Sequence, residues 1–374
     1  MELNNKIKTA IISLDIMSKK RYQEFSKMKH LQRASYEDIW SHYPMVDGVY
    51  NPDTMTKNTS IIESYLFLKY LKDKKVNCRF WYANSMFIYN DNLYRIVGKD
   101  VIKVDLDGLY YFSFREVYAH PFYKLLEELL ENNGGKLAKP NKTTMTNVGC
   151  MNKMYAITKL YKKRKEYLQD IIIPYNLKSV DYDVFLSFVM ENLGSKVVFK
   201  NDCIQEGRGV IIKDLDDGFD KPEIIESLSL HKTRQKELLI TPLYEIVAEY
   251  RCYFTNYKNA KIFSIKQRVN LTDEQDLFEK ENIHINVNMS VKWLEVLNHT
   301  DEFKQASDKA YEMIKLMQYD TGCLEFAITK DKKIVFFEVN QMAGPLPFKG
   351  DDTKNMNEYY LSIFDDMVLT QIMQ

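Results

Sequence analysis

Two glutamates and an asparagine near the end of the chain have the types and spacing of a divalent-cation site. Glu325 lies in the apolar run 322–327 (GCLEFA), and Glu338 and Asn340 lie in the run 334–340 (IVFFEVN). A short polar turn between the runs predicts an antiparallel strand pair, in which Glu338 and Asn340 share a face close to Glu325. Carboxylates this close repel, so we expect Mg²⁺ between them. The alternative is that one glutamate faces solvent or pairs with a lysine.

A second segment has the features of a phosphate-binding hairpin. Residues 197–210 (VVFKNDCIQEGRGV) read as a strand, a polar turn and a second strand. Gly207 and Gly209 lack a Cβ atom, which allows backbone N–H groups to approach phosphate oxygens, and Lys200 supplies a positive charge at the end of the first strand. A plain β-hairpin with a glycine turn is the alternative.

Charged residues also alternate along two later strands. In the segment 237–251 (ELLITPLYEIVAEYR), strand alternation places Glu249 and Arg251 on one face, and Lys266 and Arg268 share a face of the next strand. The basic groups can therefore line the same cleft as the acidic ones. Ordinary surface charge is the alternative interpretation.

The elements that would position these residues indicate an α/β fold with a later α+β part. The apolar run 9–14 predicts a buried strand and 61–72 a helix, so the N-terminal domain is expected to be α/β, and the Gly- and Asn-rich stretch 132–147 predicts a domain boundary. Helices are predicted at 153–169, 181–193, 302–317 and 357–372. Strands are predicted at 197–200, 210–213, 237–240, 246–255, 261–269, 323–329 and 334–339.

Composition excludes several classes of function. Lys plus Arg and Asp plus Glu each number 52, so the net charge is zero and neither nucleic acid nor a membrane surface is an expected partner. The five cysteines are odd in number and widely spaced, which predicts free thiols and a cytoplasmic location. We expect no signal peptide and no membrane-spanning helix. The six histidines lack i, i+4 spacing, so a histidine-bound metal is not expected.

Taken in order, these motifs resemble the ATP-grasp superfamily, in particular carboxylate–amine ligases such as ribosomal-protein glutamate ligases and D-alanine:D-alanine ligase. The resemblance runs from Asn152-Lys153 through the VVFK–GRGV hairpin and the EYR strand to GCLEFA and FEVNQMAG, about residues 145 to 350. It implies two α+β subdomains that clasp ATP, preceded by an α/β domain. The expected units are 1–140, 145–235 with the phosphate lid, and 236–374 with the metal site.

The resemblance also implies a role for each matching residue. Lys153 and Lys200 would contact the α- and β-phosphates, and Gly207, Arg208 and Gly209 would form the mobile lid. Arg251 and Arg268 would face the γ-phosphate and the acyl-phosphate as catalytic residues. The hinge would hold adenine through the backbone of Ile240, Thr241 and Leu243, with Glu245 or Glu249 near the ribose. Glu325, Glu338 and Asn340 would bind magnesium, as two ions, with Mn²⁺ as a substitute, and Gly344 would lie in the loop on the substrate side.

The implied reaction is the formation of an amide or peptide bond. ATP would phosphorylate a carboxylate, and an amine would attack the acyl-phosphate; an amino acid, a peptide and a glycan precursor are all candidate substrates, and homo-oligomerisation is left open. Two alternatives keep the fold: a small-molecule kinase with a hydroxyl acceptor, and a nucleotide-binding regulatory protein without turnover. Two departures fall on the nucleotide side, because Asn201 stands where the family often has proline and Thr241-Pro242 replaces the usual acidic hinge residue.

Overall fold

The structure is a computed structural model that describes most of the chain and contains a mixed α/β fold, as expected from the sequence. The described residues are 7–14, 19–42, 49–50, 59–82, 85–113, 121–140, 153–168, 170–173, 181–201, 210–217, 238–270, 291–296, 300–340 and 351–372.

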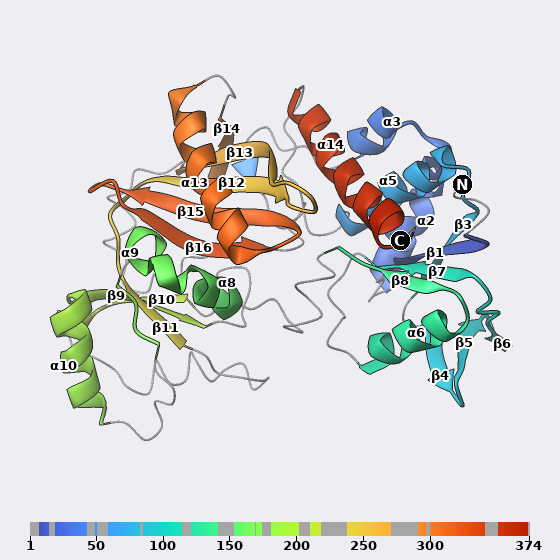
Figure 1. Ribbon diagram of the computed structural model, residues 1–374, viewed down its shortest axis with the longest axis horizontal. Coiled ribbons are helices and arrows are strands. Elements are labelled where there is room, and N and C mark those ends of the chain that lie inside the picture. Colours follow the sequence, from blue (N-terminus) through green and yellow to red (C-terminus); the bar gives the residue numbers. More distant parts are fainter. Residues whose placement is uncertain are drawn as a thin grey trace.

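The N-terminal part of the chain forms a parallel sheet between two layers of helices (Figure 1). Its inner strand β1 (Thr9–Leu14) sends alternate side chains to opposite faces, as a strand must. Ala10 and Ile12 pack in a core with helix α5 (Thr59–Asp73), whereas Ile11 packs in a second core with helix α6 (Pro121–Asn132). The sheet order is β3 (Cys78–Tyr82), β1 (Thr9–Leu14), β7 (Leu109–Phe112) and β8 (Lys136–Ala138).

Smaller elements surround this sheet. Among the described residues, three short helical segments precede α5, and a separate three-stranded antiparallel sheet lies between β3 and β7 in the sequence. The helical segments are α2 (Lys19–Lys27), η1 (Lys29–Arg33) and α3 (Tyr36–Ser41), and the strands are β4 (Met86–Tyr89), β5 (Asn92–Val97) and β6 (Asp100–Lys103).

The middle of the chain forms a three-stranded antiparallel sheet packed against one helix. Helix α10 (Tyr182–Leu193) begins where the side chain of Asp181 accepts hydrogen bonds from two backbone N–H groups, and it ends at Gly194, whose φ of 84° suits glycine. Val189 of the helix and Phe199 of the sheet share a core. The strands are β10 (Val210–Asp214), β9 (Lys196–Asn201) and β11 (Leu238–Pro242).

A six-stranded antiparallel sheet forms the largest layer. Helix α13 (Asp301–Met317), capped by the side chain of Thr300, packs with α8 (Lys153–Leu160) on one face of this sheet, against Phe254 and Leu324. Short segments η4 (Tyr161–Lys163) and α9 (Arg164–Tyr167) follow α8. The strand order is β16 (Ile334–Asn340), β15 (Thr321–Thr329), β12 (Ile246–Thr255), β13 (Lys261–Asn270), β14 (Val291–Glu295) and β2 (Val49–Tyr50).

The C-terminal helix α14 (Asp351–Asp365) packs with the N-terminal part of the chain, beside α3 and α5 (Figure 1). Phe364 lies 4.8 Å from Phe67 of α5, measured between ring centroids. The same helix also contacts the large sheet, where the rings of Tyr359 and Tyr253 lie 5.9 Å apart. The segment 236–374 that the sequence groups as one unit therefore shares a core with the first unit through its last helix. A short π-helical turn (Asp366–Thr370) and the 3-10 turn Leu215–Asp217 are the remaining elements that the structure describes.

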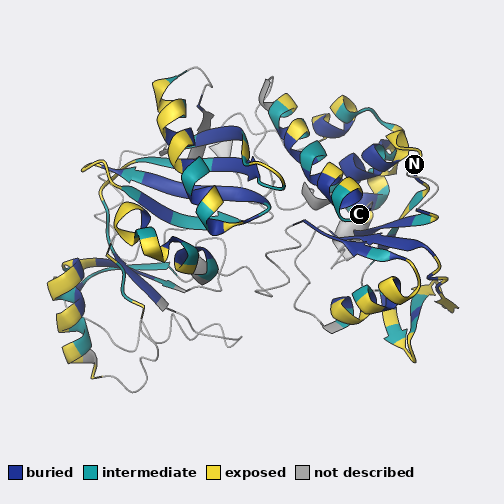
Figure 2. Ribbon diagram, viewed as in Figure 1, coloured by how far each residue is buried: buried dark blue, intermediate teal, exposed yellow. Residues whose placement is uncertain are grey.

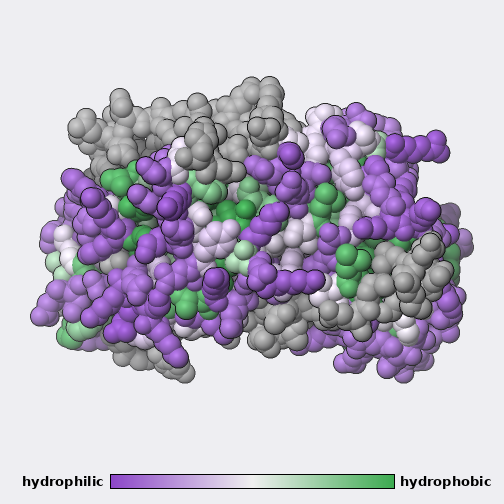
Figure 3. All heavy atoms as spheres, turned by 45° about the horizontal axis from the view of Figure 1, so that its top comes forward, coloured by the Kyte–Doolittle hydropathy of each residue, from purple (hydrophilic) through white to green (hydrophobic). Residues whose placement is uncertain are grey.

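Burial follows this layering. The inner strands β1, β7 and β15 are almost wholly buried, and exposed residues lie on the outer faces of the helices and on the small sheet of β4, β5 and β6 (Figure 2). On the face shown in Figure 3, hydrophobic side chains appear as scattered spots among hydrophilic ones. Among the helices that the structure describes, none has the length and apolar character needed to cross a bilayer.

Candidate active site

A row of charged residues crosses the large sheet on the face opposite α13. Glu338 pairs with Glu325, Glu325 with Arg251, and Arg251 with Lys266, as direct neighbours on β16, β15, β12 and β13. Residues directly opposite each other in an antiparallel pair place their side chains on the same face. The sheet therefore brings together the predicted metal ligands, one predicted catalytic arginine and a lysine in one line.

A β-bulge in β16 sets the position of Glu338. Glu325 pairs with Glu338, but the next residue, Phe326, pairs with Phe336, so Phe337 is an extra residue. Phe326 and Phe336 point into the core shared with α13. Without the bulge, Glu338 would lie on the same face as Phe336, two residues away. The extra residue moves Glu338 to the face of Glu325.

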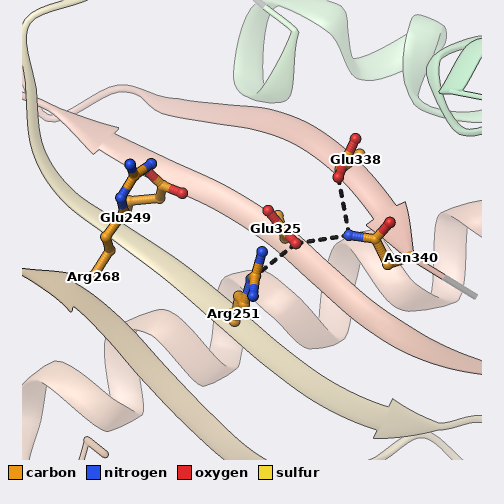
Figure 4. Close-up of polar contacts among 6 residues, drawn as sticks. All are labelled: Glu249, Arg251, Arg268, Glu325, Glu338 and Asn340. Carbon is orange, nitrogen blue, oxygen red and sulfur yellow. Dashed lines mark hydrogen bonds and ion pairs between the residues drawn. The ribbon is translucent and has the colours of Figure 1, made fainter. Parts of the chain in front are cut away.

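The amide of Asn340 connects the two carboxylates (Figure 4). Its Nδ2 donates to Oε1 of Glu325 at 2.7 Å and to Oε1 of Glu338 at 2.9 Å. The three groups that the sequence predicts as ligands thus point toward one another.

Arginines approach the acidic residues from the neighbouring strands. Nε of Arg251 forms an ion pair with Oε1 of Glu325 at 2.9 Å, although it is not aligned as a hydrogen bond. Nη1 of Arg268 donates to Oε2 of Glu249 at 2.9 Å, and these two residues are also direct cross-strand neighbours. Both arginines therefore lie on the charged face, as Figure 4 shows.

Burial and neighbouring negative charges make Glu325 a weaker acid than an ordinary glutamate. Glu325 is only 7% exposed, and its burial raises its pKa to about 7, with repulsion from Glu338 and Glu249 adding to the rise and Arg251 opposing it. Burial acts to lower the pKa of Arg251, but the neighbouring negative groups, led by Glu325, hold that pKa above its ordinary value. The guanidinium is therefore a permanent positive charge beside the carboxylates.

The donor set fits a hard divalent cation. Two carboxylates and an amide oxygen are ligands of the kind Mg²⁺ takes, together with phosphate oxygens. The amide nitrogen of Asn340 now lies between the carboxylates, and rotation of the amide by half a turn would present its oxygen instead. In the part of the chain that the structure describes, no group of three or more His, Cys, Asp or Glu side chains could hold a metal ion, and the site here consists of two glutamates and an asparagine.

Two further observations define the chemistry of this face. Lys266 is fully buried, and the sequence places it beside the arginines without assigning it a role. Its Nζ lies 5.8 Å from the ring centroid of Tyr253. Tyr253 lies on the same face as Arg251, because the two are two residues apart on β12. Burial raises the pKa of the Cys323 thiol strongly, so this cysteine is not a ready nucleophile.

On the nucleotide side, Lys200 approaches the strand that carries the metal ligands. Its Nζ lies 4.9 Å from the centroid of the Phe337 ring, the extra residue of the bulge. Lys200 lies in β9, so this contact joins the small antiparallel sheet to the large one. Of the other predicted phosphate-binding residues, the side chain of Lys153 lies outside the described residues, and so do all atoms of Gly207, Arg208 and Gly209, as well as Gly344.

The predicted adenine hinge is placed only in part. The N–H and C=O of Ile240 both bond to Ile172 at 2.9 Å, and the N–H of Leu243 donates to the carbonyl of Lys196. These three main-chain groups are therefore hydrogen-bonded within the chain, and the adenine contact expected of the hinge stays a prediction. Thr241 is buried.

The two acidic residues expected near the ribose lie in different settings. Glu245 is exposed and forms an ion pair with Lys330 at 3.1 Å, away from the charged row. Glu249 lies on the charged face with Arg268. Of the two, only Glu249 lies with the other site residues.

Similarity to solved structures defines the fold, because no family model and no curated protein matches this sequence. A RimK-domain ATP-grasp protein from Sphaerobacter thermophilus is 13% identical, with a TM-score of 0.50 over 82% of this chain and 95% of that chain. D-alanine–D-alanine ligase from Bacillus anthracis, complexed with ATP, is 15% identical, with a TM-score of 0.54 over 97% of each chain. The chain has the ATP-grasp fold.

A third solved structure with a similar fold has a peptide bound. The macrocyclase MdnC from Microcystis aeruginosa, bound with the precursor peptide MdnA, is 10% identical, with a TM-score of 0.50 over 94% of this chain and 99% of that chain. At such identities the similarity establishes the fold alone. The fold predicted from the order of the motifs is confirmed, whereas the roles of individual residues rest on the geometry described above.

Proposed function

We propose that this ATP-grasp protein is an ATP-dependent carboxylate–amine ligase. The observation that carries the proposal is the convergence of Glu325, Glu338 and Asn340 on one face of the sheet, beside Arg251. ATP would phosphorylate a substrate carboxylate, an amine would attack the resulting acyl-phosphate, and ADP and phosphate would be released. The D-alanine–D-alanine ligase with ATP supports the nucleotide assignment by its fold.

In this proposal each described residue has a physical task. Glu325, Glu338 and Asn340 would hold Mg²⁺, which when bound neutralises phosphate charge. Arg251, held in place by Glu325, offers a positive group to the transferred phosphoryl group. Arg268 lies on the same face of the sheet, on β13, two residues after Lys266, the cross-strand neighbour of Arg251. Lys200 would contact the nucleotide phosphates together with Lys153 and the glycine lid. Positioning and charge stabilisation account for catalysis of this kind.

The nature of the acceptor separates this function from the kinase alternative. A ligase releases ADP rapidly when both a carboxylate and an amine are supplied, and at most slowly with the carboxylate alone. The deciding experiment screens carboxylates against amines, including amino acids and peptides, for ADP release and identifies the products by mass spectrometry. An amide product that requires ATP supports the proposal, whereas a stable phosphorylated alcohol without an amine contradicts it.

The control for this screen comes from the chain itself. Glu338→Gln removes one charge from the proposed metal site, whereas Glu358→Gln removes a charge from the exposed face of α14, where Glu358 pairs with Lys261. ADP release that is lost in the first variant and retained in the second belongs to the proposed site. Equal activity in both variants would assign it to a contaminant or to another site.

A further inference from the structure

Two histidines twelve residues apart in the sequence face each other on the surface of the N-terminal part. His30 lies in η1, and His42 caps the C-terminus of α3. Nε2 of His30 lies 3.3 Å from Nε2 of His42, and the ring centroids are 5.2 Å apart. Both residues are exposed, so ions in solution can reach them.

The other nitrogen of each ring is fixed by the backbone. Nδ1 of His42 lies 2.8 Å from the carbonyl oxygen of Asp38, and Nδ1 of His30 lies 3.1 Å from the carbonyl oxygen of Lys27. Because a carbonyl oxygen only accepts, each Nδ1 carries a hydrogen, and in a neutral ring Nε2 then holds the lone pair. Two lone pairs therefore meet between the rings, an arrangement that needs a positive charge between them.

We propose that His30 and His42 form a binding site for a transition-metal ion of the Zn²⁺ type. Imidazole nitrogens suit Zn²⁺, Ni²⁺ and Cu²⁺. With Zn–N distances of about 2.0–2.1 Å, nitrogens 3.3 Å apart subtend an angle of roughly 104–111° at the metal, close to the tetrahedral value. The hydrogen bonds from Nδ1 to backbone carbonyls match the outer contacts that orient histidine ligands in metal sites. Water completes the coordination.

The bound ion would join two segments, one of which contacts the C-terminal helix α14. It would link η1 to the end of α3, and α3 is attached to α14 because Nε1 of Trp40 donates to Oδ1 of Asn357 at 3.1 Å. The Trp40 and Tyr360 rings also lie 5.9 Å apart. A metal ion at the histidine pair would therefore cross-link η1 to a helix that packs against α14.

The histidine pair is chemically distinct from the carboxylate cluster. Nitrogen ligands favour Zn²⁺ or Ni²⁺, whereas Mg²⁺ prefers oxygen ligands. The two sites are therefore separable by the choice of ion, and a result at one does not depend on the function proposed for the other.

Urea unfolding of the full chain tests the histidine site. Protein freed of metal with a chelator is titrated with ZnCl₂ or NiCl₂, and the unfolding midpoint is recorded for wild type, His30→Asn, His42→Asn and His231→Asn. Asparagine keeps a donor near the position of Nδ1 but has no group at Nε2. At a free metal concentration of about 100 times Kd, one site lowers the unfolding equilibrium constant about 100-fold.

The proposal expects this shift in wild type and in His231→Asn, and its loss in both His30→Asn and His42→Asn. MgCl₂ at the same concentration gives no shift that depends on either histidine. A wild-type midpoint that does not respond to Zn²⁺ or Ni²⁺ would mean that the rings share only a proton and would overturn the site. A metal-induced shift that survives in both single variants would place the bound ion elsewhere and overturn it equally.

Discussion

Glu325 and Glu338 lie directly opposite each other on adjacent strands, and the amide of Asn340 donates one hydrogen bond to each. A neutral donor thus occupies the space between two acidic groups, where electrostatics favours a cation. Glu338 is the more accessible of the two acids, because Glu325 is buried and already paired with Arg251.

Glu338→Gln should lower ADP formation at least about 100-fold while the fold stays intact, because it removes one charge from a cation site without changing side-chain shape; a loss of several kcal/mol is typical when metal-based charge stabilisation is removed. Steady-state ADP release measures the activity, and circular dichroism measures the fold. Glu358→Gln on α14 is the matched control. Turnover at the wild-type level in Glu338→Gln would remove this residue from the metal site.

The contribution of Glu325 to the stability of the metal-free protein should fall as the pH rises from about 4.5 to about 7. Burial raises the pKa of Glu325 from 4.5 to about 7, so over this range the folded chain binds more protons than the unfolded chain. At about pH 7, the upper end of this pH range, the shift has lowered the free energy of unfolding by on the order of 3 kcal/mol. Glu325→Gln has no such group, and its unfolding free energy should lack this part of the slope. Urea unfolding at several pH values in a chelating buffer measures the difference. Parallel pH profiles for the two proteins would contradict it.

Strand alternation was enough to predict that Glu338 and Asn340 share a face, because they are two residues apart. The same rule applied to Phe336 and Glu338 would place both in the core, and only the bulge at Phe337 separates them. A bulge of this kind has no signal in the run IVFFEVN, since the β-branched and aromatic residues up to Phe337 all suit a regular strand. The convergence on Glu325 was therefore predictable, but the local geometry that produces it was not.

Long-range packing set the other limits of prediction from sequence. Helix α14 has an ordinary amphipathic pattern, and nothing in that pattern indicates that Phe364 packs against Phe67 near the other end of the chain. The backbone hydrogen bonds between Ile240 and Ile172 likewise join segments that are far apart in the sequence. His30 and His42 were missed as a pair because they lie on different helical segments, so the i, i+4 rule did not apply to them. Periodicity reports on one element at a time, whereas these features depend on how elements meet.

Thr300→Ala should destabilise the protein by about 1 kcal/mol, within a range of roughly 0.5–2 kcal/mol. The side chain of Thr300 accepts a hydrogen bond of 3.1 Å from the N–H of Phe303 and so caps α13, which covers the large sheet. Thr158→Ala is the matched control, because Thr158 is exposed on α8 and its hydroxyl donates to the carbonyl of Tyr155 in its own helix. The unfolding free energy in urea measures both. A loss no greater for Thr300→Ala than for Thr158→Ala would show that the cap adds nothing to stability.

Lys200→Ala should weaken ATP binding about 10- to 100-fold, because a hydrogen bond between charged groups contributes about 1.5–3 kcal/mol. Lys200 is half-buried and lies over the ring of Phe337, next to Glu338, so its charge is held on the side of the site where the nucleotide phosphates are proposed to bind. Lys196→Ala is the control on the same strand, because Lys196 is exposed and lies 3.8 Å from Asp214. Titration calorimetry with ATP and Mg²⁺ compares the two variants with wild type. If both alanine variants bind ATP as wild type does, Lys200 does not contact the nucleotide. If both weaken it equally, the effect comes from the net charge of the small sheet and not from a phosphate contact at Lys200.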